Sequence, residues 1–450
     1  MVNTISTKYL KGNFKIVTSD SIFHTCCWLY LIALTILPDW FGFNFLMLFS
    51  AKRIMLLVCY SFIIFGRKRL FTFLRELKTY KWANLVIALY MLVRLYTAVF
   101  RADLQAFAGE FLDGVLVFYL IAYILKHELG INTVLKFLRI VLWILVIEGI
   151  LEYLTHINLF SFLDTTNQFA VITNIRDGGL RVQSNCHHPI HYGIYVSILF
   201  LLSCFDYEKN KIYLFRNPAL FLLSLIAIYL SGSRAPLGIF LLSCVVLIFF
   251  SKKDDLIKSL IILFAVFAIA ILFLFLAGNT SLGREIWQSL AMFSDQLFGT
   301  TFVADFFSAE LANEYYQSAE YRNILYSNVF ALDYLNKFLG RGVNYNFSII
   351  INDYWFKSVD NAYVLYYIQF AYPGLITFIL LLLFMSGTVL YGMFKTRGAQ
   401  KLYAAILVAF VCYFINIWYV ATMGTFMYIW MLFAIAYVAN QNIKNKGVSK

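Results

Sequence analysis

The sequence has little charge, little proline and no cysteine pattern. Asp, Glu, Lys and Arg make up 13% of its 450 residues, whereas soluble domains carry about 25%. Since 62% of the residues are hydrophobic, an ordinary soluble domain is excluded. Only five prolines occur, which argues against many broken helices because proline removes a backbone donor. Of the seven cysteines only Cys186 lies outside the apolar runs, so a disulfide framework is not expected.

What the chain has instead is a series of apolar runs. A helix crosses the hydrocarbon core of a membrane with about 17 to 25 residues. Charged segments, or segments with Gly and Pro, separate the runs here. We therefore expect an all-helical, polytopic membrane protein with about twelve transmembrane helices. The expected spans are 21–38, 53–66, 83–100, 110–125, 136–155, 190–205, 218–231, 236–251, 258–277, 363–392, 402–417 and 420–439.

Lysine and arginine are unevenly distributed over the segments between these spans. Of the 36, 24 fall in residues 1–15, 66–81, 126–139, 206–217, 251–258, 395–401 and 440–450. Because translocated short loops are depleted of both residues, we predict that these segments and both termini are cytoplasmic. The first span lacks a small-residue cleavage site after it and is expected to act as a signal anchor. The net charge of +12 then reflects anchoring at the inner leaflet and not nucleic-acid affinity.

The remaining segments are expected outside, and they use a different cation. They comprise 39–52, 101–109, 156–189, 231–235, 278–362 and a short turn near 418. Nine of the twelve basic residues outside the cytoplasmic segments are arginines, whereas the cytoplasmic segments hold 18 lysines and six arginines. The planar guanidinium recognises phosphate with two parallel hydrogen bonds, so the outer face suits a phosphorylated ligand. Alternatively, these arginines snorkel or pair with nearby acids, namely Asp103, Glu110, Asp113, Glu148 and Glu152.

Arg181 and Arg234 stand out because both border short turns that would meet on the outer surface. Arg181 opens RVQSNCHHPIHYG, and Arg234 lies in LSGSRAPLG, where a Ser-Gly-Ser turn offers hydroxyls and amides to an anion. His187 and His188 could bond a phosphate or an acceptor hydroxyl. A metal site is not expected, because Pro189 interrupts the geometry and no acid is adjacent. Equally, His188 and Pro189 could simply start the helix.

The chain divides into an N-terminal transmembrane bundle of about nine spans (1–277), a long outer loop (278–362) and C-terminal spans (363–450). The first half of the loop, 302–338, is predicted to be helical, and Gly340 and Gly342 to stop it. The Asn- and aromatic-rich sequence that follows suits sugars, whose ring faces stack on aromatic side chains. The aromatic candidates are Tyr315, Tyr316, Tyr321, Tyr354 and Trp355, which could alternatively form an aromatic belt at the membrane interface.

Four motifs in this order resemble those of the O-antigen polymerase and O-antigen ligase superfamily. They are RVQSNCHHPIHYG, LSGSRAPLG, YRN with LGRG starting 18 residues after it, and SVDNAYVLYYIQFAYPGLITF. The similarity covers most of residues 176–385 and includes a large periplasmic loop that closes in Asp/His-Asn-x-Tyr. Many ligases have a histidine where this chain has Asp360, so a polymerase is favoured.

The resemblance implies a GT-C-like glycosyltransferase of the bacterial inner membrane that works at the periplasmic face on undecaprenyl-diphosphate-linked glycans. Neither a metal, a cofactor nor a nucleotide sugar is implied, and a chain-length regulator is an implied partner. Arg181 and Arg234 then match the arginines that hold the diphosphate. The further substrate-binding candidates are Arg322, Arg341, Asn361, Tyr363 and Tyr321.

Catalysis would displace undecaprenyl diphosphate from the anomeric carbon by an acceptor hydroxyl, and fixed guanidiniums would stabilise the leaving group. Asp360, His187 and His188 are the catalytic candidates, although Asp360 could instead pair with an arginine. A ligase that transfers finished polymer to lipid A core is the alternative. A flippase is less favoured, since carriers often show repeated halves and no internal repeat is found here.

Overall fold

The computed structural model is 77% helical. The residues that it describes are 21–45, 47–167, 175–176, 179–277, 280–332, 336–345, 348–351, 354–356, 359–397, 400–421 and 423–448. The helices of the first half are α2 (Ser21–Thr35), α3 (Ala51–Phe65), α4 (Arg67–Thr79), α5 (Lys81–Arg101), α6 (Leu104–Glu110), the π-helix η1 (Phe111–Leu116), α7 (Val117–His127), α8 (Ile131–Thr155), the 3₁₀ turn η2 (Leu159–Leu163) and α9 (Pro189–Ser203).

The second half is helical as well. Its helices are α10 (Pro218–Leu230), α11 (Arg234–Ile248), α12 (Lys253–Ala277), α13 (Ser281–Phe298), α14 (Phe302–Phe306), α15 (Ala309–Asn328), η3 (Val329–Ala331), α16 (Ala362–Lys395), α17 (Leu402–Tyr419), η4 (Met423–Thr425) and α18 (Phe426–Val448). The described strands form antiparallel two-stranded pairs: β1 (Gly42–Phe45) with β2 (Met47–Ser50), β3 (Ile175–Arg176) with β4 (Gly179–Leu180), β5 (Phe205–Asp206) with β6 (Lys211–Ile212), and β7 (Ile349–Ile351) with β8 (Tyr354–Phe356).

A helix lies within each predicted apolar run. In the described part of the chain, five helical segments are long and apolar enough to cross a membrane. They are Lys81–Arg101, Leu104–His127, Ala362–Lys395, Leu402–Tyr419 and Met423–Ile443. Four shorter apolar helices are Ser21–Thr35, Pro189–Ser203, Pro218–Leu230 and Arg234–Ile248. A helical membrane protein is compatible with these lengths, and the count of twelve crossings stays a prediction.

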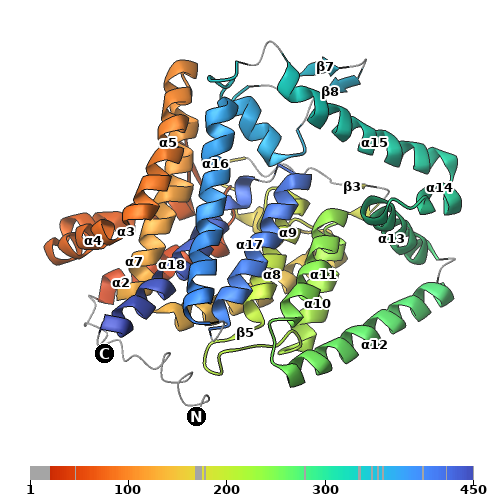
Figure 1. Cartoon of the computed structure of the whole chain (residues 1–450), viewed down its shortest axis with the longest axis horizontal. Helices are drawn as coiled ribbons and strands as arrows, with labels where there is room; N and C mark the ends of the chain where they lie inside the picture. The colour runs from red at the N-terminus through yellow and green to blue at the C-terminus, as the bar shows by residue number, and fades with distance from the viewer. Residues whose placement is uncertain are drawn as a thin grey trace.

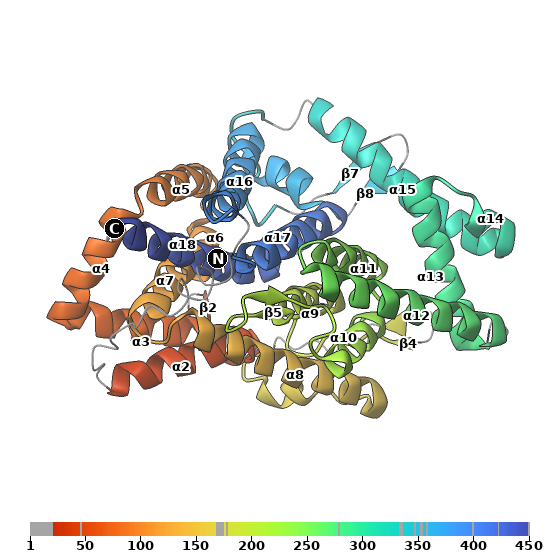
Figure 2. The ribbon, with the colours of Figure 1, turned by 60° about the horizontal axis from the view of Figure 1, so that its bottom comes forward.

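The core of the bundle forms around α17 (Figure 2). This helix packs against α9, α11 and α16, while α18 packs against α7 and α5 packs against α16. Large side chains fill the interior: Trp430, Tyr195 and Tyr413 are fully buried, and the rings of Tyr195 and Tyr428 stack at 3.7 Å. Helices that are apolar on nearly all sides can be both packed inside and exposed to lipid outside, which fits their continuous apolar sequences.

The segments between the helices meet at two opposite ends of the bundle. At one end Asn185 Nδ2 donates to Ile36 O at 3.0 Å, and Thr165 Oγ1 donates to Gly42 O at 2.6 Å. We call it the loop end; β7 and β8 lie there, at the top of Figure 1. At the other end Lys126 Nζ donates to Gln441 Oε1 at 2.9 Å. We call this the lysine end; β5 and the end of α18 lie there, at the bottom of Figure 1. Segments predicted for opposite sides of a membrane are thus separated.

Helix α16 is broken at Ala371, whose φ of 56° and ψ of −162° lie outside the helical region. Two residues later Pro373 has no N–H to donate to Gln369 O, and the break turns the N–H of Tyr372 away from Ile368 O. The carbonyls of Ile368 and Gln369 and the N–H of Tyr372 find new hydrogen-bond partners in residues 337–342. Arg341 N donates to Ile368 O at 2.9 Å, Gly342 N donates to Gln369 O at 3.0 Å, and Tyr372 N donates to Lys337 O at 3.2 Å.

Gly340 lies at the centre of this docked segment. A Cβ at Gly340 would collide with the backbone of Gln369, so no other residue fits without moving the segment. The break is therefore a joint in which two chain segments satisfy each other's backbone groups, as non-helical backbone within a membrane protein requires.

The segment 280–332 is helical, as predicted for 302–338, but its helix ends earlier than expected. Helix α15 stops at Asn328 and η3 adds one turn to Ala331, whereas Gly340 and Gly342 were predicted to stop it. The side chain of Asn328 donates to Ile324 O at 2.8 Å, and an Asn that bonds its own helix in this way favours termination.

Candidate functional site

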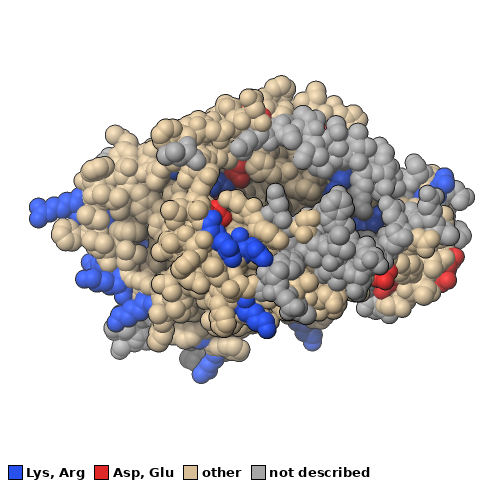
Figure 3. All heavy atoms as spheres, turned by 90° about the horizontal axis from the view of Figure 1, so that it is seen from above, with Lys and Arg blue, Asp and Glu red and all other residues tan. Residues whose placement is uncertain are grey.

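A cavity with a volume of about 540 Å³ lies at the loop end. Six separate chain segments contribute to it, and basic and acidic atoms lie close together near the middle of this face (Figure 3). We call it the charged cavity. Its polar lining comprises Asp39, Lys52, Arg53, Arg94, Gln105, Glu110, Asp113, Asn344, Tyr366 and Gln369, and its aromatic lining includes Phe426 and Trp430.

Arg94 is held in the most deeply buried part of the cavity wall. Its Nη2 donates to the hydroxyl of Tyr366 at 2.7 Å and lies 3.5 Å from Glu110 Oε2. The hydroxyl of Tyr90 donates to Glu110 Oε1 at 2.9 Å and lies 2.7 Å from that of Tyr366. The guanidinium also lies over the ring of Phe370 at 4.5 Å. This closed relay compensates a buried cation and fixes its orientation.

The π-helix η1 (Phe111–Leu116) places a second ion pair in the cavity. Its wide turn carries Asp113, which accepts from Arg53 Nε at 3.0 Å and from Arg53 Nη2 at 2.6 Å. The next residue, Gly114, lies so close to the indole of Trp430 that a Cβ would meet Nε1 at 2.6 Å. Single π-turns inside α-helices occur frequently at functional sites, because they re-aim side chains without ending the helix.

Asp39 and Lys52 form the third pair, with Lys52 Nζ 2.6 Å from Asp39 Oδ1. Burial raises the pKa of Asp39, but the Lys52 ammonium outweighs it and holds that pKa below its ordinary range. His187 approaches the other carboxylate oxygen, with its Nε2 3.9 Å from Asp39 Oδ2, and its ring meets that of Trp40 edge-on at 5.2 Å. Asp39 therefore joins the charged cavity to the histidine segment.

The loop that follows the docked glycine closes the cavity from one side. Asp103 is buried, and its Oδ2 accepts from the backbone N–H of Val343 at 2.9 Å and of Asn344 at 3.3 Å. Its Oδ1 accepts from Asn344 Nδ2 at 2.8 Å. Nearby, Arg101 Nε donates to Gly340 O at 2.7 Å. Two residues at the end of α5 thus hold the part of the outer loop that lines the cavity.

Arg181 lies against the Ser-Gly-Ser turn that precedes Arg234. Arg181 Nε donates to Ser231 O at 3.0 Å, and its Nη2 donates to Ser233 Oγ at 2.9 Å. Gly232 has a φ of +59°, and a Cβ there would meet Arg181 Cγ at 2.8 Å, so the turn requires glycine. We call Arg181 with residues 231–233 the arginine turn.

His188 occupies the N-cap of α9, where its Nδ1 accepts from Ile190 N at 3.1 Å and Pro189 follows in the first turn. His188 and Pro189 therefore start the helix, which was the alternative to a role for His188 in binding a phosphate or an acceptor hydroxyl. Burial, and then the charge of Arg181, lower the pKa of His188. The arginine turn and the charged cavity are therefore neighbours, linked through His188, His187 and Asp39.

The other predicted site residues have these positions. Arg234 begins α11, and its guanidinium contacts the sulfur of Met292 in α13. Asn361 is fully buried and caps α16, accepting from the N–H of Tyr363 at 2.9 Å and from that of Val364 at 3.1 Å. The hydroxyl of Tyr363 donates to Phe414 O at 3.3 Å.

The last four predicted residues come from the outer loop. Asp360 is half-buried, and its backbone oxygen accepts from Tyr326 at 3.4 Å. The Arg341 guanidinium lies over the ring of Tyr345 at 5.6 Å. Arg322 and Tyr321 belong to α15, and their side chains lie outside the described residues.

Among the predicted site residues whose side chains the structure describes, none lines the charged cavity. Its ionisable residues were instead assigned to the alternative in which outer arginines pair with nearby acids, and Arg53–Asp113 and Arg94–Glu110 are such pairs. A signal for them was present, because Arg94, Glu110 and Asp113 lie within or at the ends of apolar spans. An ionisable residue in such a span marks a functional site by default.

Chemically, the charged cavity offers carboxylates, guanidiniums, an amide and aromatic faces, which is the set that binds sugar hydroxyls and ring faces. The arginine turn adds a guanidinium, which suits an oxyanion. Within the described residues, no group of three His, Cys, Asp or Glu is arranged to hold a metal ion. No protein-family model and no curated protein matches the chain.

Proposed function

We propose that this protein is a membrane glycosyltransferase that polymerises O-antigen or a related surface polysaccharide from undecaprenyl-diphosphate-linked repeat units. The observation that carries the proposal is the charged cavity of about 540 Å³ beside the arginine turn at one end of an apolar helix bundle. A donor with a lipid tail, a diphosphate and a glycan needs three adjacent environments. Apolar helices, the guanidinium of Arg181, and a polar cavity with aromatic walls could supply them.

The proposed reaction is a single displacement at the anomeric carbon of the donor sugar. The acceptor hydroxyl attacks the anomeric carbon of the donor sugar, the bond between that carbon and the diphosphate oxygen breaks, and undecaprenyl diphosphate leaves. Arg181, held in place by Ser231 O and Ser233 Oγ, stabilises the charge that develops on the leaving group. His187 accepts the hydroxyl proton, and Asp39 orients its ring. His188 is less suited, since its Nδ1 caps α9.

The proposal includes a placement in the membrane. The chain would cross a bacterial inner membrane about twelve times with both termini in the cytoplasm and the loop end in the periplasm. The clustering of lysine-rich segments at the end opposite the charged cavity supports this orientation. A chain-length regulator in the same membrane would be a partner.

The test is the surface polysaccharide ladder of a deletion strain of the source bacterium, complemented with wild type, Arg181→Ala or His187→Ala at matched expression. We expect core with a single repeat unit in the deletion strain and in both variants. Lys136→Ala is the matched control, because it removes one cation from an exposed pair at the lysine end.

Other outcomes decide against the proposal. Bare core with long lipid-linked polymer accumulating in the deletion strain would identify a ligase, in which the acceptor is lipid A core. A full ladder in the deletion strain would exclude both activities. If Arg181→Ala produced a wild-type ladder, the arginine turn would have no role in the reaction.

A further inference from the structure

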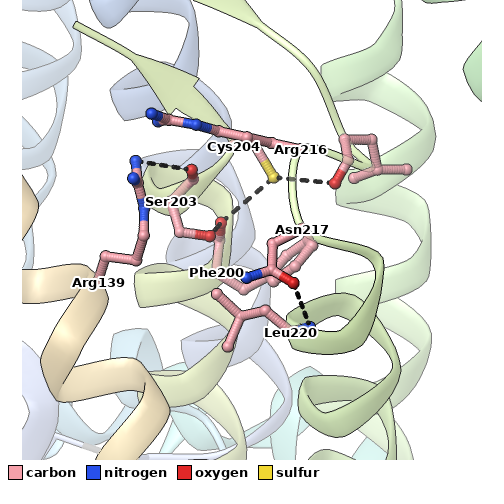
Figure 4. A pocket seen from close by; sticks show the side chains of 8 residues that line it. Arg139, Phe200, Ser203, Cys204, Arg216, Asn217 and Leu220 are labelled. Atoms are coloured by element: carbon pink, nitrogen blue, oxygen red, sulfur yellow. Dashed lines mark hydrogen bonds between the residues drawn. The ribbon is translucent and has the colours of Figure 1, made fainter.

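A second, smaller cavity of about 110 Å³ lies at the lysine end (Figure 4). Its polar lining consists of Arg139 from α8, Ser203 from the end of α9, and Arg216 and Asn217 from the turn before α10. Phe200, Leu214 and Leu220 form its apolar side. We call it the arginine pocket. Its volume is far more than the roughly 10–15 Å³ that one water needs, so it has room for a small polar group.

Two guanidiniums converge in the arginine pocket. Arg139 Nη2 donates to Ser203 O and to Phe205 O, both at 3.3 Å. Arg216 Nη1 donates to the same Phe205 O at 2.8 Å. Because one carbonyl oxygen accepts from both, the two like charges lie within a few ångströms of each other, an arrangement that repels unless an anion is shared.

One carboxylate is available to offset these charges. Asp206 Oδ2 lies 2.9 Å from Arg216 Nη2, whereas the hydrogen bonds of Arg139 to other described residues go to carbonyl oxygens. Its buried Nε has no hydrogen-bond partner there. The lining side chains and Asp206 together carry a net positive charge. A buried N–H without an acceptor is costly, so the geometry calls for an oxyanion.

The depth of the arginine pocket points to a headgroup. Arg139 lies eight residues after the start of α8, about 12 Å along the axis at 1.5 Å per residue. The side chain bends back to the carbonyls at the end of α9, where the lysine-rich segments gather. Basic pockets between helices at this level bind phosphate-bearing lipid headgroups.

We propose that the arginine pocket binds a phosphate oxyanion through Arg139 and Arg216. The shared chemistry is a phosphate group, which a lipid headgroup or free phosphate could supply. The inference stands whichever reaction the loop end performs.

The experiment measures the unfolding midpoint of the purified full-length protein in a neutral detergent, with added phosphatidylglycerol, phosphatidylcholine or inorganic phosphate. For wild type we expect phosphatidylglycerol to raise the midpoint by about 2 °C or more over phosphatidylcholine. Arg139→Gln, which keeps a donor for the two carbonyls, should lose that difference. Native mass spectrometry should show one retained phosphatidylglycerol on wild type and none on the variant.

Lys136→Gln is the control, because it removes one positive charge from the same helix one turn away, at an exposed pair with Glu208. It should respond to phosphatidylglycerol like wild type. Arg139→Lys tests geometry: it keeps the charge without the planar fork and should retain less than half of the shift.

A different result would assign the arginine pocket to free phosphate. In that case inorganic phosphate would raise the unfolding midpoint of wild type but not of Arg139→Gln, and phosphatidylglycerol would add nothing. Equal shifts with phosphatidylglycerol in wild type and Arg139→Gln, or no shift with either anion, would overturn the proposal.

Discussion

The two ends of the bundle handle buried cations in different ways. At the loop end each cation of the charged cavity has a carboxylate partner, and Arg94 lies in a closed relay with two tyrosines and Glu110. In the arginine pocket at the lysine end, two guanidiniums converge on backbone carbonyls with Asp206 beside them. The charged cavity is therefore electrically complete without a ligand, whereas the arginine pocket is not.

This difference separates two kinds of recognition. A charge-balanced cavity with rigid donors and acceptors suits a large neutral ligand such as a glycan, because such a ligand adds no charge to be compensated. A pocket with excess positive charge suits an anion and depends on it for stability. The following changes test the comparison, from the largest expected effect to the smallest.

Arg94→Ala should have the largest effect, because it leaves the half-buried Glu110 and the two buried tyrosine hydroxyls without their cation. Breaking a buried pair in this way costs about 3–5 kcal/mol, measured as the free energy of unfolding in detergent. The double variant Arg94→Met/Glu110→Gln removes both charges and should recover most of the loss. If Arg94→Ala unfolded like wild type, the relay would contribute nothing and the comparison would fail.

Asp103→Ala should have the second largest effect, and a local one. It removes the acceptor for the N–H groups of Val343 and Asn344, each such bond to a charged group contributing about 1.5–3 kcal/mol. Hydrogen exchange at residues 343 and 344 should speed up, and the polysaccharide ladder should shorten. Asp103→Asn keeps an acceptor oxygen and should have a smaller effect on both. Unchanged exchange in Asp103→Ala would show that the loop is held by other contacts.

A smaller effect should appear with pH. The folded state lowers the pKa of His188 below its unfolded value of about 6.5, so its contribution to stability is complete above that pH and is lost as pH falls through the folded pKa. The reason is that protonated Nδ1 no longer accepts from Ile190 N, and such a cap contributes about 0.5–2 kcal/mol.

His188→Asn supplies a cap that does not titrate in this range. The unfolding midpoint of wild type should decline below pH 6.5 more steeply than that of the variant. Parallel curves would mean that the acid sensitivity arises elsewhere.

Lys136→Ala should have the smallest effect. Its pair with Glu208 at 2.7 Å is exposed on both sides, so solvent screens the attraction. We expect an unchanged unfolding midpoint and an unchanged ladder. A clear loss of stability would show that exposed pairs at the lysine end contribute as buried ones do at the loop end, which would remove the contrast.

The helical architecture could be predicted from the sequence because hydropathy is a local property. Each expected span coincides with a helix, and the contact between Arg181 and residues 231–233 follows from two short turns on one side of the bundle. The charged cavity could not be predicted, because its lining comes from six segments that only packing brings together.

Two backbone features also could not be predicted from the residues around them. The π-turn that carries Asp113 has an ordinary apolar helix sequence. The break in α16 falls on Ala371, although the φ/ψ region that it occupies is costly for residues other than glycine, by about 1–3 kcal/mol. Hydrogen bonds from residues 337–342 impose that conformation, so the information lies some 30 residues away in the chain.

The joint between residues 337–342 and α16 has a practical consequence for labelling. An epitope tag or a fluorescent-protein insertion at Gly340 would strand the carbonyls of Ile368 and Gln369 inside the protein. The turn at Gly299, which is exposed and has open space around it, can accept the same insertion without disturbing either segment. Reporters of membrane orientation should therefore be placed between α13 and α14.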